Sequence, residues 1–195
     1  SRPALSFSGD PASHSWQACA ALRLRCNGRL CIIRPRDTTR RGTRVITIAM
    51  SAVIDADPER VWRALTVPTE LAAWDESLLG PVEAFPEYPA AGCSVRWRCR
   101  LGGVQTVLYD RPLDVEPPGR LRSAISIGSM RYEQTFTLTP EPGAALRTRL
   151  GMKVVAANSI AVVGAVVDRF AVRKLTSERI DATLQSLQKW CAQDL

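Results

Sequence analysis

The pattern of apolar positions predicts an ordered domain that begins near Val45. Residues 45–54 are rich in β-branched side chains, which is typical of a strand. Asp57 and Pro58 then predict a helix start, with Asp57 as the N-cap and Pro58 at the first helical position. A second short helix is expected after Pro68. The buried stripe of the first helix is predicted to consist of Val61, Trp62 and Leu65.

Six strand-like runs separated by turn residues follow the two helices. Gly102 and Gly103 predict a two-residue hairpin, and Pro112 predicts a bulge or an edge position in its strand. A helical period returns only near Asn158 and continues to about Ala192. This order predicts an α+β fold, in which one antiparallel sheet is folded around one long helix. The six runs are Pro81–Tyr88, Cys93–Leu101, Val104–Val115, Leu121–Ile127, Met130–Thr139 and Ala144–Val155.

Strand alternation separates an outer face of the sheet from an inner one. Arg96, Arg98 and Arg100 share one face and are expected to point to water, because three neighbouring arginines are costly to desolvate. In Val104–Val115 the assignment stays open, since Tyr109 and Asp110 fall on opposite faces. The mainly apolar inner set fits either a solid core or a cavity with a few polar groups. The expected inner set is Val95, Trp97, Cys99, Leu101, Leu121, Ser123, Ile125, Ile127, Met130, Tyr132, Gln134, Phe136, Leu138, Leu146, Thr148, Leu150, Met152 and Val154.

The basic residues are unevenly distributed over the 195-residue chain. The net charge is +7, and residues 1–44 alone hold nine Arg and two Asp. Residues 45–195 therefore hold 17 basic and 17 acidic side chains and are electrically balanced. This balance disfavours a nucleic-acid footprint that extends over the domain, so no specific nucleic-acid partner is expected.

Residues 1–44 form a basic leader without a sustained apolar period. We expect this leader to be disordered or a non-native extension, with the domain occupying residues 45–195. Three interpretations stay open for the leader: a basic arm that binds nucleic acid, an Arg-rich targeting peptide, or an extension ahead of a natural start near Val45 or Met50.

Cysteine spacing and hydropathy exclude several classes of site. The six cysteines show no C-x2-C zinc spacing, and the single histidine, His14, lies in the leader, so no metal or cofactor is expected. The longest apolar run, Val154–Val167, is interrupted by Asn158 and Ser159 and is too short for a transmembrane segment. No stretch of the leader has the basic start, apolar run and small-residue cleavage site of a secretion signal, so reduced cysteines in the cytoplasm are the expected state.

Two neighbouring segments carry a family resemblance. The sequence IDADPERVWRAL at residues 54–65, continued by LAAWD at 71–75, resembles the opening of the SRPBCC (START-like) superfamily, specifically its polyketide cyclase/dehydrase and lipid-transport group. Residues 115–121, residues 135–140 and the amphipathic C-terminal helix are similar to the usual layout of that superfamily. The resemblance implies a helix-grip fold, in which a seven-stranded sheet grips the last helix and leaves a cavity between them.

Binding of a small hydrophobic molecule is the expected function, and the sequence does not name the ligand or the oligomeric state. Residues 45–195 contain no histidine, no Ser-His-Asp set and no Gly-rich phosphate loop, so catalysis is not expected. Two alternatives stay open: a polyketide cyclase or dehydratase that uses Asp110 and Tyr132, and a ribosome- or membrane-interaction protein that uses the leader. The resemblance and the alternation together predict a lipid, quinone or polyketide-like ligand bound by Trp97, Cys99, Tyr109, Ser123, Tyr132, Gln134, Phe136, Thr148, Met152, Val163 and Phe170.

Overall fold

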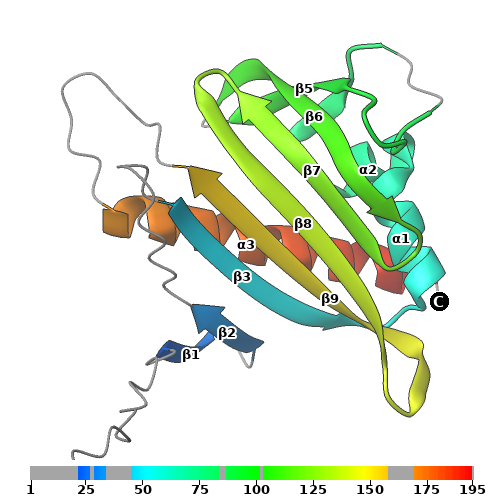
Figure 1. Cartoon of the computed structure of the whole chain (residues 1–195). Helices are drawn as coiled ribbons and strands as arrows, with labels where there is room; N and C mark the ends of the chain where they lie inside the picture. The colour runs from blue at the N-terminus through cyan, green and yellow to red at the C-terminus, as the bar shows by residue number, and fades with distance from the viewer. Residues whose placement is uncertain are drawn as a thin grey trace, which may run out of the picture.

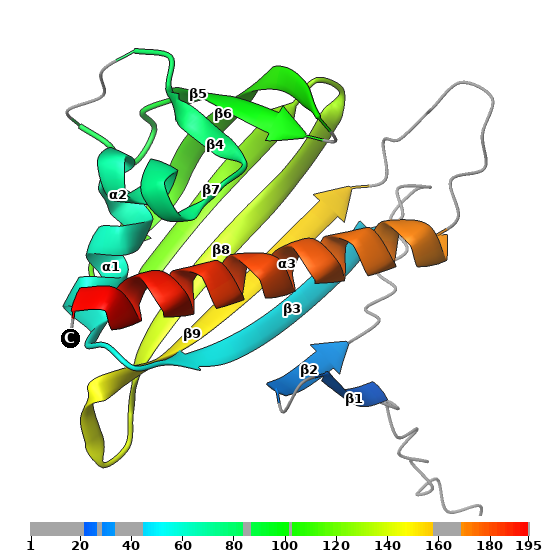
Figure 2. The same cartoon turned by 180° about the vertical axis from the view of Figure 1, so that it is seen from behind.

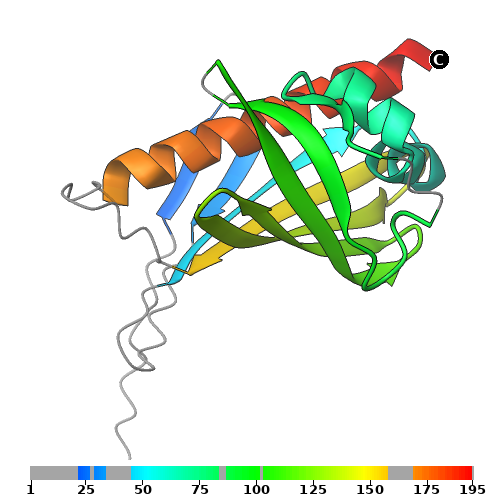
Figure 3. The ribbon, with the colours of Figure 1, turned by 90° about the horizontal axis from the view of Figure 1, so that it is seen from above.

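A seven-stranded antiparallel sheet curls around the C-terminal helix (Figures 1 and 3). The computed structural model describes residues 22–26, 29–33, 45–83, 87–101, 103–157 and 169–194. In this sheet the strands lie in the order β3-β9-β8-β7-β6-β5-β4, so the first and last strands of the domain are neighbours. The predicted α+β helix-grip fold is confirmed. The strands are β3 (Val45–Ile54), β4 (Leu78–Pro81), β5 (Val95–Leu101), β6 (Val104–Glu116), β7 (Arg120–Ile127), β8 (Met130–Glu141) and β9 (Ala144–Ala157).

The two short helices begin where the sequence predicted. Asp57 caps α1 (Pro58–Thr66), because its Oδ1 accepts a hydrogen bond of 2.7 Å from the Arg60 backbone N–H. Val61 and Leu65 are buried, as expected, whereas Trp62 is only partly buried and packs against the edge of the core. The prediction that Trp62 belongs to the buried stripe is therefore wrong, since the buried residues of α1 are Val61, Ala64, Leu65 and Thr66. Helix α2 (Pro68–Trp74) follows and buries Trp74.

The strand boundaries agree with the sequence pattern except at the first run. Pro112 lies at a bulge of β6, as predicted, because the register between β6 and β7 shifts between Pro112 and Asp114. Gly103 has a φ of +84° in the predicted hairpin between β5 and β6, a backbone conformation that favours glycine. The predicted strand Pro81–Tyr88 is wrong: β4 spans Leu78–Pro81, and residues 87–89 and 91–92 form turns. Pro89 lies in the first of these turns and supplies no backbone N–H for strand pairing, which disfavours a strand at this point.

Helix α3 (Arg169–Cys191) lies across the concave face of the sheet (Figure 2). Its buried residues Ile180, Leu184, Leu187 and Cys191 recur at helical spacing, and the helix packs against β3, α1 and α2. The predicted helix began near Asn158, but residues 158–168 lie outside the described residues. Helix α3 is followed by the short 3-10 helix η1 (Ala192–Asp194). Among the described residues, no helix is both long and apolar enough to cross a membrane.

Two short strands lie within the basic leader and were not predicted. Strands β1 (Leu22–Cys26) and β2 (Arg29–Ile33) form an antiparallel hairpin. The hairpin extends the sheet to nine strands by placing β2 beside β3, where Cys31 pairs with Met50. The other residues of 1–44 lie outside the described residues, so the leader expectation stays a prediction.

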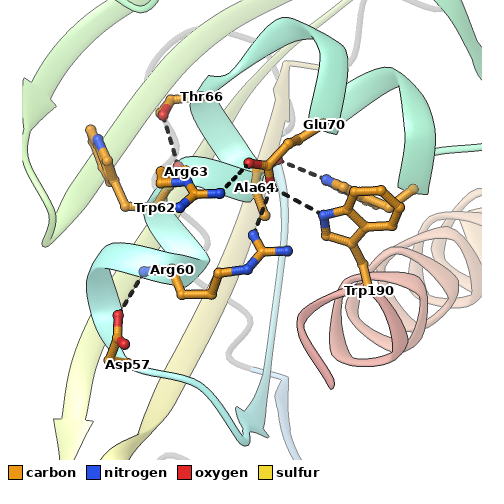
Figure 4. A network of polar contacts seen from close by, with 9 residues as sticks. Asp57, Arg60, Trp62, Arg63, Ala64, Thr66, Glu70 and Trp190 are labelled. Atoms are coloured by element: carbon orange, nitrogen blue, oxygen red, sulfur yellow. Dashed lines mark hydrogen bonds and ion pairs between the residues drawn. The ribbon is translucent and has the colours of Figure 1, made fainter. Parts of the chain in front are cut away.

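A polar network around Glu70 fastens the two short helices to α3 (Figure 4). The Glu70 carboxylate accepts hydrogen bonds from Arg60 at 2.6 Å and from Arg63 at 3.0 Å, both on α1. It also accepts one of 3.1 Å from the indole Nε1 of Trp190 on α3. Only 16% of the Glu70 side chain is exposed, so this carboxylate joins three helices from a largely buried position.

Candidate functional site

The concave side of the sheet is divided into a solid core and a cavity. The core lies under β3, where α3 packs against the strand, and it includes Ile48 and Ile54 of β3 together with Leu184 and Leu187 of α3. Toward β5–β8 the space between sheet and helices contains a cavity of about 570 Å³, which is within the range of small-molecule sites. The sequence left open whether the inner face lines a core or a cavity, and the structure contains both.

Apolar side chains from the sheet and from the segment around α2 form most of the cavity wall. Trp74 belongs to this wall, and its orientation is fixed because its indole Nε1 donates a hydrogen bond of 2.7 Å to the Ala64 carbonyl. Trp97 and Cys99 of β5 are each 1% exposed and also line the cavity. Further apolar lining residues are Leu108, Leu121, Ile125, Ile127, Phe136, Met152, Val154 and Ile180.

One ionisable side chain lies deep in this wall. Asp110 of β6 lines the cavity and is 7% exposed. Its Oδ2 accepts a hydrogen bond of 3.0 Å from the Tyr88 hydroxyl, and Tyr88 in turn packs edge-on against Trp97 with ring centroids 5.9 Å apart. Asp110 Oδ1 has no hydrogen-bond partner within the described part of the chain. A buried acceptor without a donor is uncommon in folded proteins and points to a ligand.

Burial controls the protonation of these two residues. Burial raises the pKa of Asp110 to about 6, although the neighbouring hydroxyls of Ser123 and Tyr88 oppose this rise. Burial also raises the pKa of Tyr88 well above its ordinary value, and the negative charge of Asp110 adds to that effect. Tyr88 therefore stays a neutral donor, and Asp110 changes its charge near neutral pH.

Two further polar side chains of β8 face the cavity. Gln134 pairs with Ser123 across the β7–β8 ladder, and Tyr132 pairs with Ile125, which itself pairs with Asp110. Neither Tyr132 nor Gln134 makes a side-chain hydrogen bond to any other described residue, and both line the cavity. Burial raises the pKa of Tyr132 to about 12, so its hydroxyl stays protonated at neutral pH. Both groups are available as donors or acceptors toward a ligand.

An ion pair between α3 and the end of α2 borders the cavity. Arg179 donates hydrogen bonds of 2.9 and 3.1 Å to the two carboxylate oxygens of Asp75, and it also contacts the Ser77 hydroxyl. These three residues line the cavity, as do the exposed residues Met130 and Arg131 at the start of β8. The cavity thus reaches the surface between β8 and α3.

The structure brings together most, but not all, of the sequence-predicted site residues. Tyr109 points to the outer face and is 49% exposed, because the alternation of β6 turns Leu108 and Asp110 inward instead. Thr148 is fully buried away from the cavity, where its hydroxyl donates to the Ala56 carbonyl at 2.7 Å. Val163 and the side chain of Phe170 lie outside the described residues. The predicted residues that line the cavity are Trp97, Cys99, Ser123, Tyr132, Gln134, Phe136 and Met152.

Two residues of the expected inner face are exposed instead. Leu146 is 62% exposed, because it lies near the hairpin between β8 and β9, beyond the layer that α1 and α3 cover. Met130 is 42% exposed at the beginning of β8, although it still lines the outer part of the cavity. Alternation assigns a side chain to a face, but it does not show where along the strand that face is covered.

The sequence did not indicate Tyr88, Asp75 or Arg179 as site residues. Tyr88 was placed in a strand that does not exist, and Arg179 lies 104 positions from its partner Asp75. For Asp110, the alternation along Val104–Val115 leaves the orientation of the side chain open. A contiguous sequence signal could not have found these contacts, because each of them joins distant elements.

The fold and the apolar cavity define a START-like helix-grip protein with a small-molecule pocket between the sheet and the last helix. The chain belongs to the family described as polyketide cyclase/dehydrase and lipid transport, whose model matches residues 45–191. The comparison with curated proteins found no match.

Solved structures support the same fold. A Rhodobacter sphaeroides protein is 26% identical, with a TM-score of 0.58 over 75% of this chain and 91% of its own. A START superfamily protein from Mycobacterium smegmatis is 15% identical, with a TM-score of 0.62 over 79% of this chain and 100% of its own. A Chromobacterium violaceum protein is 20% identical, with a TM-score of 0.57 over 73% of this chain and 94% of its own.

Proposed function

We propose that this protein binds a small hydrophobic ligand, such as a lipid, a quinone or a polyketide-like molecule, without changing it chemically. The observation that carries the proposal is the apolar cavity of about 570 Å³ between β5–β8 and α3, with its few polar groups. The family description, which includes lipid transport, supports the same class of ligand.

Several features favour binding over catalysis. Residues 45–195 contain no histidine, and the described residues hold no group of three His, Cys, Asp or Glu that is suited to a metal ion. Asp110 is the only carboxyl among the lining residues that is not engaged by a cation, since Asp75 is held by Arg179. The cavity therefore offers one acceptor and several neutral polar groups, which suits orientation of a ligand.

Catalysis by Asp110 is the alternative that a specific observation favours. A carboxyl whose pKa lies near 6 is suited to act as a general base at neutral pH, and Tyr132 belongs to the same row of inward residues across β6–β8. A cyclase or dehydratase of this kind would lose turnover in Asp110→Asn while it still bound its ligand. A carrier would lose only affinity in the same variant.

A cytoplasmic location is part of this proposal. Two cysteines of the domain, Cys93 and Cys99, are free thiols, which supports a reducing compartment.

A pair of serine substitutions on β7 tests ligand binding. Ser123 is 4% exposed and lines the cavity, whereas Ser126 lies on the opposite face of the same strand and does not line it. Ser123→Trp is expected to fill the cavity and abolish binding of the neutral fluorescent probe Nile red, and Ser126→Trp is the matched control that should bind normally. Native mass spectrometry of freshly purified protein should also detect a retained small molecule in the wild type and none in Ser123→Trp.

Three results would contradict the proposal. One is the absence of Nile red binding to the wild type together with no retained molecule. Another is equal binding by the wild type and a folded Ser123→Trp. The third is a loss of about 1–3 kcal/mol of stability in Ser123→Trp without any binding to lose, which would indicate a solid core.

A further inference from the structure

We propose that Asp110 makes the cavity selective for apolar ligands that carry a hydroxyl group, and that Asp110 Oδ1 accepts the hydrogen bond from that hydroxyl. The inference rests on the proposed function, because it names the class of ligand that the same cavity takes. Three features of the structure support it: where Asp110 lies, how its carboxyl is oriented, and which polar groups surround it.

Asp110 lies in the interior of the sheet rather than at its rim. Strand β6 is bordered by β5 and β7, and Asp110 pairs with Val95 on one side and with Ile125 on the other. These two neighbours are buried and apolar, at 0% and 5% exposure. A carboxyl in such a position has few routes to bulk solvent other than the cavity that it lines.

The orientation of the carboxyl leaves one oxygen for a ligand. Tyr88 donates to Oδ2 at 3.0 Å, and the edge-on packing of Tyr88 against Trp97, with an angle of 83° between the rings, holds the phenol in place. The Ser123 hydroxyl lies near the carboxyl and favours its charged form, but no hydrogen bond joins the two side chains, and Oδ1 has no hydrogen-bond partner among the described residues. The carboxylate can only accept hydrogen bonds, so the missing partner must be a donor.

A ligand without a donor would leave Oδ1 buried and unpaired after it had displaced solvent from the cavity. Hydrogen bonds to charged groups are among the stronger ones in proteins, and losing one costs about 10- to 100-fold in affinity. A hydroxylated ligand is therefore expected to bind more tightly than its methyl ether, although the ether is more hydrophobic and would be preferred by a purely apolar cavity.

The surroundings favour a hydroxyl over an ammonium group. A hydroxyl needs one acceptor and gains from one donor, and Tyr132 and Gln134 provide neutral groups that can donate to its oxygen. An ammonium carries three donors, and the largely apolar wall would leave some of them unpaired. The cavity is also bordered by Arg131, whose positive charge disfavours the entry of a cation, whereas the charge of Arg179 is compensated by Asp75.

Four naphthalene probes test this selectivity at pH 7.5 by isothermal titration calorimetry: naphthalene, 2-naphthol, 2-methoxynaphthalene and 2-naphthylmethylamine. We expect the wild type to bind 2-naphthol at least about tenfold more tightly than the other three. Asp110→Leu should bind naphthalene and 2-methoxynaphthalene and should lose the preference for 2-naphthol. Asp114→Leu is the matched control, because Asp114 lies on the same strand, forms an ion pair with Arg120 and does not line the cavity.

The possible outcomes separate this inference from the proposed function. Binding of 2-naphthol no tighter than its methyl ether, tighter binding of the amine, or an unchanged preference in Asp110→Leu would overturn the selectivity while leaving ligand binding intact. Failure of the wild type to bind any of the four probes would count against the proposed function itself. If Asp110→Leu does not fold, Asp110→Asn replaces it, and its neutral amide should reduce the preference for 2-naphthol.

Discussion

The hydroxyl of Tyr88 donates a hydrogen bond of 3.0 Å to Oδ2 of Asp110, and this contact joins the segment before β5 to the middle of β6. Tyr88 is a neutral donor, so it orients the carboxylate without neutralising its charge. The described residues place no arginine or lysine in an ion pair with Asp110. A buried carboxylate in this environment destabilises the folded state when it is ionised, and that cost leads to the first prediction.

We predict that Asp110→Asn gains stability relative to the wild type as the pH rises. Burial raises the pKa of Asp110 from 3.8 to about 6, so the folded state binds the proton more tightly than the unfolded chain does. The tighter proton binding stabilises the folded wild type fully below about pH 4, and this stabilisation is lost as the pH rises through 6. The asparagine variant has no such proton, so its stability does not fall in this way. Urea unfolding should show a relative gain of about 2 kcal/mol for the variant between pH 4.5 and pH 7.5. Equal differences at both pH values would contradict the assignment, and Asp114→Asn serves as the control.

Glu70→Gln is expected to destabilise the protein with the opposite pH dependence. Burial alone would raise the pKa of Glu70, but hydrogen bonds from Trp190 and Arg63 and the charge of Arg60 outweigh burial and lower it. The stabilisation is therefore present above about pH 4.5 and is lost as the pH falls through the lowered pKa. We expect a loss of about 1–2 kcal/mol at pH 7, because Gln keeps the size but loses the charge-assisted hydrogen bonds.

The matched control for Glu70→Gln is Glu59→Gln, in the first turn of α1. Glu59 is exposed, so its substitution should change the free energy of unfolding by less than about 0.5 kcal/mol. A loss in Glu70→Gln no larger than in Glu59→Gln would show that the network in Figure 4 contributes little.

Most of the fold could be predicted because its signals are local. Asp57 and Pro58 mark the helix start, and Gly103 supplies the turn between β5 and β6. The wrong strand prediction for Pro81–Tyr88 arose because this segment carries both strand-like and turn-like residues. Tyr88 continued an apolar run that resembles a strand, but the chain there turns toward Asp110 instead of pairing with a neighbour.

The site was predicted less completely because the phase of β6 changes along its length. Before the bulge at Pro112, Leu108 and Asp110 point inward, whereas after it Val115 packs against the core. Alternation counted across the whole of β6 therefore cannot assign its residues to the inner and outer faces, because the bulge reverses the assignment. Thr148 shows the second difficulty: it was correctly placed on the inner face, but that part of the face is covered by the connection between β3 and α1.

Leu65→Ala is predicted to destabilise the protein more than Trp62→Ala, although tryptophan is the larger side chain. Leu65 is 1% exposed in the middle of the core, so its truncation should cost about 2–5 kcal/mol. Trp62 is only partly buried, and its removal leaves less empty space inside the protein. Urea unfolding of both variants provides the comparison. A larger loss in Trp62→Ala would contradict this prediction and would show that Trp62 contributes more to the core than its partial burial indicates.

Thr148→Val is predicted to lower stability without affecting ligand binding. The Thr148 hydroxyl donates to the Ala56 carbonyl at 2.7 Å, and a valine of similar shape would leave that buried carbonyl unpaired. The expected loss is about 1–3 kcal/mol. Nile red affinity should stay the same as in the wild type, because Thr148 does not line the cavity. Weaker probe binding in a folded Thr148→Val would instead support its original assignment as a ligand-binding residue. Thr139→Val, at an exposed position of β8, is the control.

The last prediction concerns the boundary between the basic leader and the domain. A chain that starts at Thr43 keeps all of β3, and we expect it to fold with nearly the same thermal midpoint, because β2 lies beside β3 but its ladder pairing with β3 is limited to Cys31 and Met50. A chain that starts at Met50 lacks half of β3 and loses Ile46 and Ile48 from the core.

Circular dichroism during heating should separate these two shortened chains. Each lost isoleucine removes buried apolar surface, and β9 loses its pairing partner over Val45–Ala49, so the chain that starts at Met50 should melt at a clearly lower temperature or fail to fold. Failure of the chain that starts at Thr43 would show instead that the leader hairpin is part of the folded domain. Equal thermal midpoints for both chains would mean that the first half of β3 contributes little, which its burial and its complete pairing with β9 argue against.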